Sequence, residues 1–219
     1  MIKQLFFGLF LFTLCTRVSA QKNNIEYGFQ SGVNLSSAYG DNVGKEQNGI
    51  IAGLHIGGHI KVNVTNHFGV KAILAYHQTG STWGALLFEN STATGLVAGE
   101  LHNKLNYLNL PVLAEYSTGK KVKFNVNAGV FAGYLLKYTM VIKTEEPGIS
   151  AQRTSPGNRK AINFGVSAGT GIQIPIATTI KLDIGLQDNL GLSNTYKQGN
   201  GTAKINSFTV MAGLTFALQ

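Results

Sequence analysis

Eight segments of this sequence alternate apolar residues with polar residues, small residues or glycine, and the links between them have two very different lengths. Period-2 alternation is typical of a β-strand whose two faces meet different surroundings. Three links are very short and four are long, which is the asymmetry of a membrane barrel with turns at one rim and loops at the other. The segments are Ile25–Ser36, Ile51–Val64, Phe68–Gln78, Leu105–Tyr116, Val122–Tyr138, Ala161–Ile174, Ile180–Leu190 and Ile205–Leu218, and the short links are Thr65–His67, Ser117–Lys121 and Pro175–Thr179.

The residue types on the two faces decide between a soluble barrel and a membrane barrel. A soluble barrel of the lipocalin kind hides its apolar side chains inside, whereas a membrane barrel turns them outward. In the fifth segment one face carries Val122, Phe124 and Val126, and the other carries Lys123, Asn125 and then glycines. Glycine and amides suit the narrow interior of a small barrel. The sequence therefore predicts an all-β fold, an eight-stranded antiparallel up-and-down transmembrane β-barrel, and leaves the soluble barrel as the alternative.

Aromatic residues on the apolar face gather near the ends of the segments. Two such girdles are typical of a barrel that meets two membrane interfaces. We expect one girdle near the short links and the other near the long links. The first comprises Tyr27, Phe68, Tyr116, Phe124 and Phe216, and the second Tyr76, Tyr134, Tyr138 and Phe208.

The first twenty residues form a separate unit. Lys3 precedes the apolar run Leu5–Leu14, and Val18-Ser19-Ala20 supplies a cleavage site, so residues 1–20 are predicted to be a secretory signal peptide cleaved after Ala20. Leu14 stands where lipid attachment to Cys15 would want a small residue, which disfavours a lipoprotein. The remaining residues, 21–219, are expected to form one outer-membrane barrel domain without disulfides.

The chain has 18 basic and 10 acidic residues, a formal net charge of +8. A basic balance is compatible with nucleic acid or anionic lipid as a partner. The lysines are scattered rather than gathered with aromatic residues in a patch. We therefore expect no nucleic-acid partner, and membrane lipid as the surroundings of the barrel.

One segment resembles a known family. Asn106–Tyr116 reads NYLNLPVLAEY, which is similar to the Y-L-x-I-P-L-L-x-x-Y strand of the Bacteroidota outer-membrane β-barrel family, often called PorT-like. Gly28–Asn34, the hairpin of the second and third segments, and the last segment share the resemblance. It implies a barrel in the outer membrane of a bacterium. The family mixes many roles, its name-giving type being linked to a secretion apparatus, and it implies no catalytic motif.

The last segment also resembles the signal read by the barrel-assembly machinery. Gly213, Phe216 and Leu218 supply a glycine followed by spaced apolar residues, although the chain ends on Gln219 where an aromatic residue is usual. The resemblance implies this machinery as a partner during assembly.

Charged residues on the polar face predict ion pairs inside the barrel. Counting outward from the fourth link pairs Glu115 with Lys123, and the same count at the second link places Lys61 opposite Lys71. Facing lysines repel unless carboxylates separate them. Two carboxylates, Glu26 and Glu115, are suited to this role, and Asp183 shares a face with Lys181. We expect a packed plug that does not conduct, with a narrow selective pore as the alternative.

Histidines share the polar face. The register that opposes the two lysines also opposes His55 and His77, with Cβ atoms ~5 Å apart. This pair is the candidate metal site, but His59 lies four residues along and zinc wants three or four ligands. A hydrogen-bonded pair that fills the lumen is the alternative. No motif indicates a cofactor.

No sequence motif indicates an enzyme. Four residues near the long links, Glu100, His102, His77 and Asp188, have acid–base side chains but no diagnostic spacing. We expect a monomer with a structural or partner-binding role through its loops. An outer-membrane enzyme acting on lipid or peptide and a small-solute channel remain alternatives. The apolar third link, 79–104, is expected either to lengthen its strands or to contact a partner, and the fifth link, 139–160, to be solvated.

Overall fold

The computed structural model describes residues 25–41, 49–89, 96–144, 150–154, 159–197 and 202–218. The expected signal peptide lies outside these residues. None of the described residues belongs to a helix long and apolar enough to cross a membrane. The strands are β1 (Ile25–Tyr39), β2 (Ile51–Asn63), β3 (Phe68–Glu89), β4 (Leu96–Thr118), β5 (Lys123–Thr144), β6 (Ser150–Thr154), β7 (Ile162–Pro175), β8 (Ile180–Gly191) and β9 (Lys204–Ala217).

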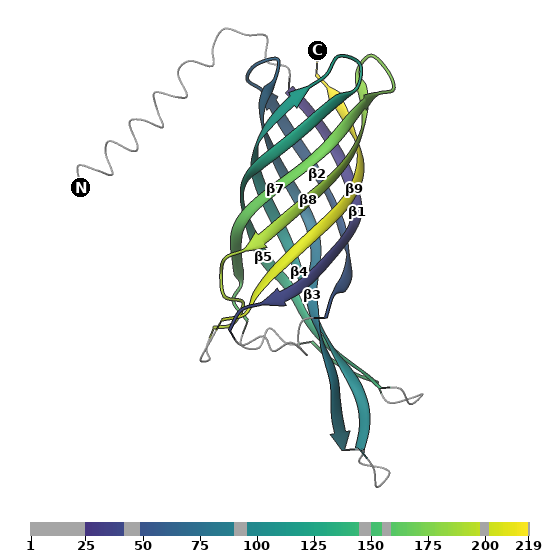
Figure 1. The fold of residues 1–219 in the computed structure, drawn as a ribbon, viewed down its shortest axis with the longest axis vertical. Helices are drawn as coiled ribbons and strands as arrows, with labels where there is room; N and C mark the ends of the chain where they lie inside the picture. Colours follow the sequence, from purple (N-terminus) through teal and green to yellow (C-terminus); the bar gives the residue numbers. More distant parts are fainter. Residues whose placement is uncertain are drawn as a thin grey trace, which may run out of the picture.

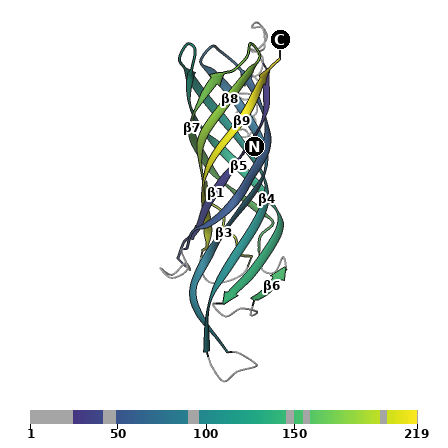
Figure 2. The same ribbon diagram turned by 90° about the vertical axis from the view of Figure 1, so that its right-hand side faces the viewer.

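Eight of these strands close into one antiparallel barrel. Each strand pairs with the next in the order β1-β2-β3-β4-β5-β7-β8-β9, and β9 pairs with β1. The short strand β6 pairs only with β5 and lies outside the ring (Figure 2). The eight-stranded up-and-down barrel predicted from the sequence is confirmed, and all eight predicted segments overlap a barrel strand.

The two rims of the barrel differ as the link lengths predict. At the short-turn end, the Val64 N–H donates to the Phe68 carbonyl at 2.8 Å, and Gly119 turns the chain with a φ of +117°. The first and last barrel strands also meet at this end, where the Leu218 N–H donates to the Ile25 carbonyl (2.9 Å). The barrel is drawn with its short-turn end at the top in Figure 1.

At the opposite rim, the loop end, strands continue beyond the barrel (Figures 1 and 2). The β3–β4 ladder runs on to Glu89↔Leu96, although the β2–β3 ladder stops at His55↔His77. The third link therefore lengthens its strands, one of the two expected outcomes. In the fifth link, where the sequence predicts a solvated segment, β5 extends to Thr144 and β6 pairs with it.

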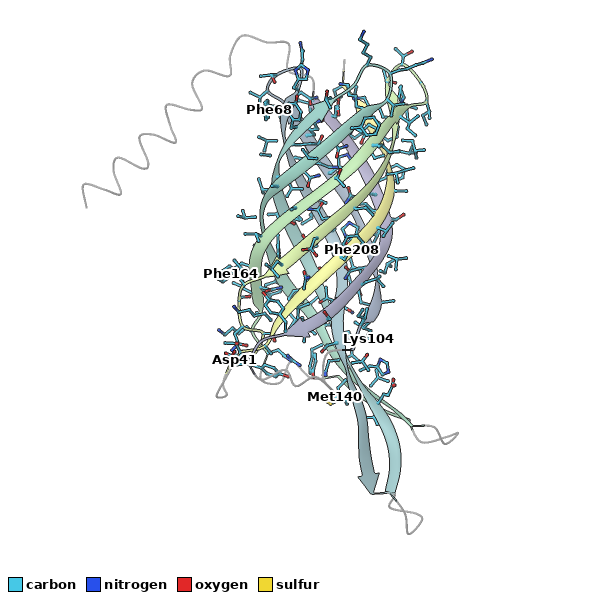
Figure 3. All side chains as sticks on the ribbon, in the orientation of Figure 1. Asp41, Phe68, Lys104, Met140, Phe164 and Phe208 are labelled. Carbon is cyan, nitrogen blue, oxygen red and sulfur yellow. The ribbon has the colours of Figure 1, made fainter. Side chains whose placement is uncertain are left out.

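The apolar side chains of the strands face outward. Phe124 and Val130 are each 60% exposed, whereas Asn34 is fully buried and Asn109 is 3% exposed. Such an apolar outside and polar inside is the arrangement of a barrel that crosses a membrane, and the reverse of a soluble barrel. Figure 3 shows outward side chains along the whole barrel, from Phe68 at the short-turn end to Phe164 and Phe208 nearer the loop end.

Inward-facing glycines leave room for long side chains to extend across the interior. A Cβ added at Gly165 would lie 2.8 Å from the Phe131 Cε1 atom, and one at Gly69 would lie 2.9 Å from the Lys61 Cε atom. Both contacts are closer than a real Cβ tolerates. The inward glycines are therefore explained by space rather than by turns.

One irregularity reverses part of the predicted pattern. The β4–β5 register jumps between Asn106↔Lys137 and Tyr107↔Leu135, which leaves Leu136 without a partner. Because this bulge adds one residue, Tyr138 points into the barrel and is buried. Its predicted place in the outer aromatic girdle is wrong. Other girdle members do meet on the outside, where Tyr27 stacks on Phe216 (5.5 Å) and Phe68 packs on Tyr116 (4.9 Å).

Candidate functional site

The polar interior is the candidate site, and an ion pair crosses it near the short-turn end. The Lys61 Nζ atom lies 2.6 Å from the Glu115 Oε1 atom, with both side chains buried. Ser117 donates its hydroxyl to the same oxygen at 3.2 Å. These residues come from β2 and β4, and Lys61 reaches across the intervening β3 over Gly69.

The predicted pairing of Glu115 with Lys123 is wrong. Strand β4 continues to Thr118, which pairs with Phe124, so the turn lies farther along the chain than the sequence pattern predicts. Glu115 consequently lies opposite Asn127, and Lys123 lies opposite Gln173 of β7. The predicted opposition of Lys61 and Lys71 is confirmed.

The remaining interior carboxylates have other partners. Lys181 Nζ lies 2.5 Å from Glu26 Oε1, so Glu26 neutralises Lys181 rather than separating the two facing lysines. Asp183, predicted to stand beside Lys181, accepts a hydrogen bond from the Thr215 hydroxyl. The same hydroxyl lies 2.8 Å from the His59 Nε2 atom, which links this histidine to the carboxylate.

The two candidate metal ligands form a hydrogen-bonded chain across the lumen. His55 and His77 face each other as predicted, with their Nδ1 atoms 3.0 Å apart. The Gln30 amide donates to His55 Nε2 at 2.9 Å, and His77 Nε2 lies 3.1 Å from the Ser207 hydroxyl oxygen. Two neutral imidazole rings can satisfy every one of these contacts. His55 then accepts from Gln30 and donates its Nδ1–H to His77, and His77 donates its Nε2–H to Ser207. Within the described residues no three His, Cys, Asp or Glu side chains cluster as metal ligands.

A second interior cluster lies toward the loop end. Leu105, Tyr107, Tyr138 and Ile205 pack together inside the barrel. Arg159 packs against Tyr138 of this cluster. Its guanidinium carbon lies 4.8 Å from the centre of the Tyr138 ring and 3.9 Å from the centre of the Tyr196 ring. It also donates to the Thr195 hydroxyl at 3.1 Å. The sequence does not predict this cluster. Simple alternation turns Tyr138 outward because it does not account for the bulge, and Arg159 belongs to a link that the sequence predicts to be solvated.

The four acid–base residues near the long links do not form one site. His77 lies inside the lumen, whereas His102 lies on the outer face of β4 between the buried Leu101 and Asn103. His102 Nε2 is 3.2 Å from the exposed Glu100 carboxylate. Asp188 also faces outward, from β8, between the buried Gln187 and Asn189. Only His102 and Glu100 are in contact.

The residues of the expected assembly signal all lie on or next to the last strand. Gly213 faces inward and packs against Gln30, Phe216 stacks on Tyr27 at the outer surface, and Leu218 is exposed just after β9. The exposed apolar residues are therefore at the short-turn rim.

A closed antiparallel barrel with an apolar outside and a polar, hydrogen-bonded inside defines the class of transmembrane β-barrel proteins. Residues 19–197 match the family described as outer membrane protein beta-barrel domain, and the chain belongs to that family. The family and the apolar outer surface assign the protein to the outer membrane.

Solved structures similar to this chain are small outer-membrane barrels. The attachment invasion locus protein Ail of Yersinia pestis is 16% identical, with 87% of this chain and 98% of that chain covered and a TM-score of 0.39. Outer Membrane Protein W of E. coli is 11% identical over 91% and 100% of the two chains (TM-score 0.47). OprG of Pseudomonas aeruginosa is 11% identical over 90% and 95% (TM-score 0.46). A comparison with curated protein sequences gave no match.

Proposed function

We propose that this protein is a non-conducting barrel that binds an envelope partner through the sheet projecting from its loop end. The observation that carries the proposal is the continuation of β3, β4 and β5 past the barrel, with β6 added at the edge (Figure 2). A barrel needs no such sheet to close or to cross the membrane. Long ordered loops on a rigid scaffold are where binding residues concentrate.

The interior supports a closed rather than an open lumen. An eight-stranded barrel has an interior just wide enough for side chains to fill. Here the hydrogen-bonded side chains from Gln30 to Ser207 cross it, and the Lys61–Glu115 pair crosses it nearer the short turns. The alternative of a narrow solute channel would require these contacts to open.

Several finer features belong to the same proposal. The protein is a monomer whose loop end faces outside and whose short turns and termini face the periplasm, after cleavage of the signal peptide behind Ala20. It is of the PorT-like Bacteroidota type, on the resemblance of Asn106–Tyr116. The barrel-assembly machinery reads its last strand through Gly213, Phe216 and Leu218. It is not an enzyme. This part of the proposal is supported by the separation of the four acid–base residues near the long links, which do not form one site.

The test removes the β3–β4 part of the projecting sheet and leaves the barrel. Residues 83–101 are replaced by Asn-Gly, because Thr82 and His102 face each other in the ladder and can flank a two-residue turn. A photo-crosslinking amino acid is placed at Thr82 in the full-length protein, with a matched control at Ile176, which is exposed in a short turn. We expect crosslinks to an envelope component from position 82, none from position 176, and loss of the partner on native purification of the shortened protein.

Two outcomes would contradict the proposal. Stepwise single-channel currents from the purified protein in a planar bilayer would favour the channel. An altered lipid A mass in cells that express the wild type, absent with Asp188→Asn or His102→Gln, would favour the enzyme.

A further inference from the structure

We propose that the short-turn mouth of the barrel is a binding site for a phosphate-bearing anion. The site lies at the opposite end from the projecting sheet and does not depend on the proposed function. Its walls come from three short turns and from the ends of β1 and β9 that meet there. It is the place where the interior of the barrel opens between the turns.

The mouth contains a hollow of ≈ 890 Å³. Its polar lining combines cationic side chains with hydroxyls and amides. The lining includes Glu26, Asn66, Lys123, Thr178, Thr179 and Lys181. Gly119 belongs to the wall as well, and the two lysines that follow it, Lys120 and Lys121, are exposed on the rim. We call this hollow and its rim the basic vestibule.

The carboxylates near the vestibule already have partners. Glu26 binds Lys181 at 2.5 Å, and Glu115, deeper in the lumen, binds Lys61 at 2.6 Å. Asp183 accepts a hydrogen bond from Thr215. Each acidic group is thereby neutralised or hydrogen-bonded within the barrel.

The two ion pairs leave Lys71 and Lys123 without a carboxylate partner among the described residues. Of these two lysines, Lys123 is the one that lines the vestibule, where it is half-buried. The β4–β5 register is the cause, because it sets Glu115 opposite Asn127 and leaves Lys123 facing Gln173. A partly desolvated ammonium without a counter-charge favours an anion that supplies one.

The chemistry of the lining points to phosphate. Lysine acts on phosphate as a compact point charge, and hydroxyl groups add neutral donors around it. Lys123 would hold the anion from inside the vestibule, and the exposed Lys120 and Lys121 would attract it from the rim. Thr178 and Thr179, which also line the hollow, carry such hydroxyls.

The experiment measures binding of inorganic pyrophosphate to the refolded full-length barrel in nanodiscs of neutral phosphatidylcholine, by calorimetry. We expect saturable binding in the wild type, weakened about tenfold or more by Lys123→Gln, since a hydrogen bond to a charged group contributes roughly that factor. Lys123→Arg, which keeps the charge, should retain it. Lys104→Gln at the loop end is the matched control and should bind as the wild type does. Correct folding of each variant is checked by its heat-dependent gel mobility.

A second arm identifies the source of the phosphate. Nanodiscs of mixed phosphatidylcholine and phosphatidylglycerol are compared for lipid retained on the purified barrel, with wild type and with the Lys120→Gln, Lys121→Gln double variant. Retention that depends on these two lysines assigns a lipid headgroup, whereas pyrophosphate binding alone assigns a soluble anion. If the wild type binds neither probe, or if Lys123→Gln binds both as tightly as the wild type, the vestibule is not an anion site.

Discussion

The Glu115–Lys61 pair shows what a single residue does in this lumen. Both side chains are buried, and the carboxylate also accepts from Ser117. Glu115→Ala would leave the Lys61 ammonium buried without a counter-charge, which costs roughly 3–5 kcal/mol when one member of a buried pair is removed. We expect a correspondingly lower free energy of unfolding in urea with lipid vesicles.

The matched variants separate the charge from the packing. Glu115→Gln combined with Lys61→Met removes both charges at similar volume and should be much milder than Glu115→Ala, because no charge is stranded. Lys123→Gln should leave stability close to the wild type, since Lys123 has no ion pair among the described residues. Equal losses for Lys123→Gln and Glu115→Ala would show that Glu115 pairs with Lys123 after all.

Arg159 connects β5 to the segment after β8 at the loop end. Its guanidinium lies between the rings of Tyr138 and Tyr196 and donates to Thr195. Arg159→Lys keeps the charge but loses the planar fork that stacks and donates at once. We expect a destabilisation of about 1–2 kcal/mol, the range of a partly desolvated cation–π contact. The readout is faster trypsin cleavage after Lys197, with Lys160→Gln as the neighbouring control; equal cleavage rates would count against the stacked arrangement.

At the scale of elements, alternation alone identifies all eight barrel strands, because a membrane barrel imposes opposite polarity on its two faces. The His55–His77 pairing also follows from sequence, since a very short link leaves the register little freedom. The predicted register is wrong at the fourth link. The polar residues Ser117 and Thr118 are typical of a turn, but in the structure they continue the ladder. The Lys61–Glu115 contact joins non-adjacent strands, so a count along one hairpin does not reach it. The expectation that Glu115 serves the facing lysines is nevertheless confirmed for Lys61.

The bulge at Leu136 yields a prediction about β5. Leu136 has no partner on β4, so its deletion should leave Leu135 facing inward, Lys137 outward and Tyr138 inward, with the ladder made regular. We expect the deletion variant to fold and to keep Tyr138 protected from iodination. Deletion of Ala132, which pairs regularly with Leu110, would turn every later side chain to the opposite face. That variant should fail to show the heat-dependent gel mobility of a folded barrel.

At the scale of the whole molecule, the two ends of the barrel are built for different surroundings. The short-turn end is compact, with Lys120 and Lys121 exposed beside Gly119, whereas the loop end carries a sheet several residues longer than the barrel wall (Figure 1). A single lumen joins the two ends, but the His55–His77 hydrogen bond and the Lys61–Glu115 ion pair cross it at two levels. The two proposed sites therefore lie at opposite ends of the barrel and can be tested separately.

This difference between the ends predicts the topology in the cell. If the loop end faces outside, an external protease acting on intact cells should cut within 79–104 or 139–160 and spare the lysines at the fourth link, although Lys120 and Lys121 are both exposed and good trypsin sites. Permeabilising the outer membrane should then allow cleavage after Lys120 or Lys121. The fragments are identified by mass, and Lys120→Gln with Lys121→Gln is the control that removes the second cut. Cleavage at the fourth link in intact cells would place the short turns outside and reverse the orientation, which would also move the basic vestibule from the periplasmic to the external face.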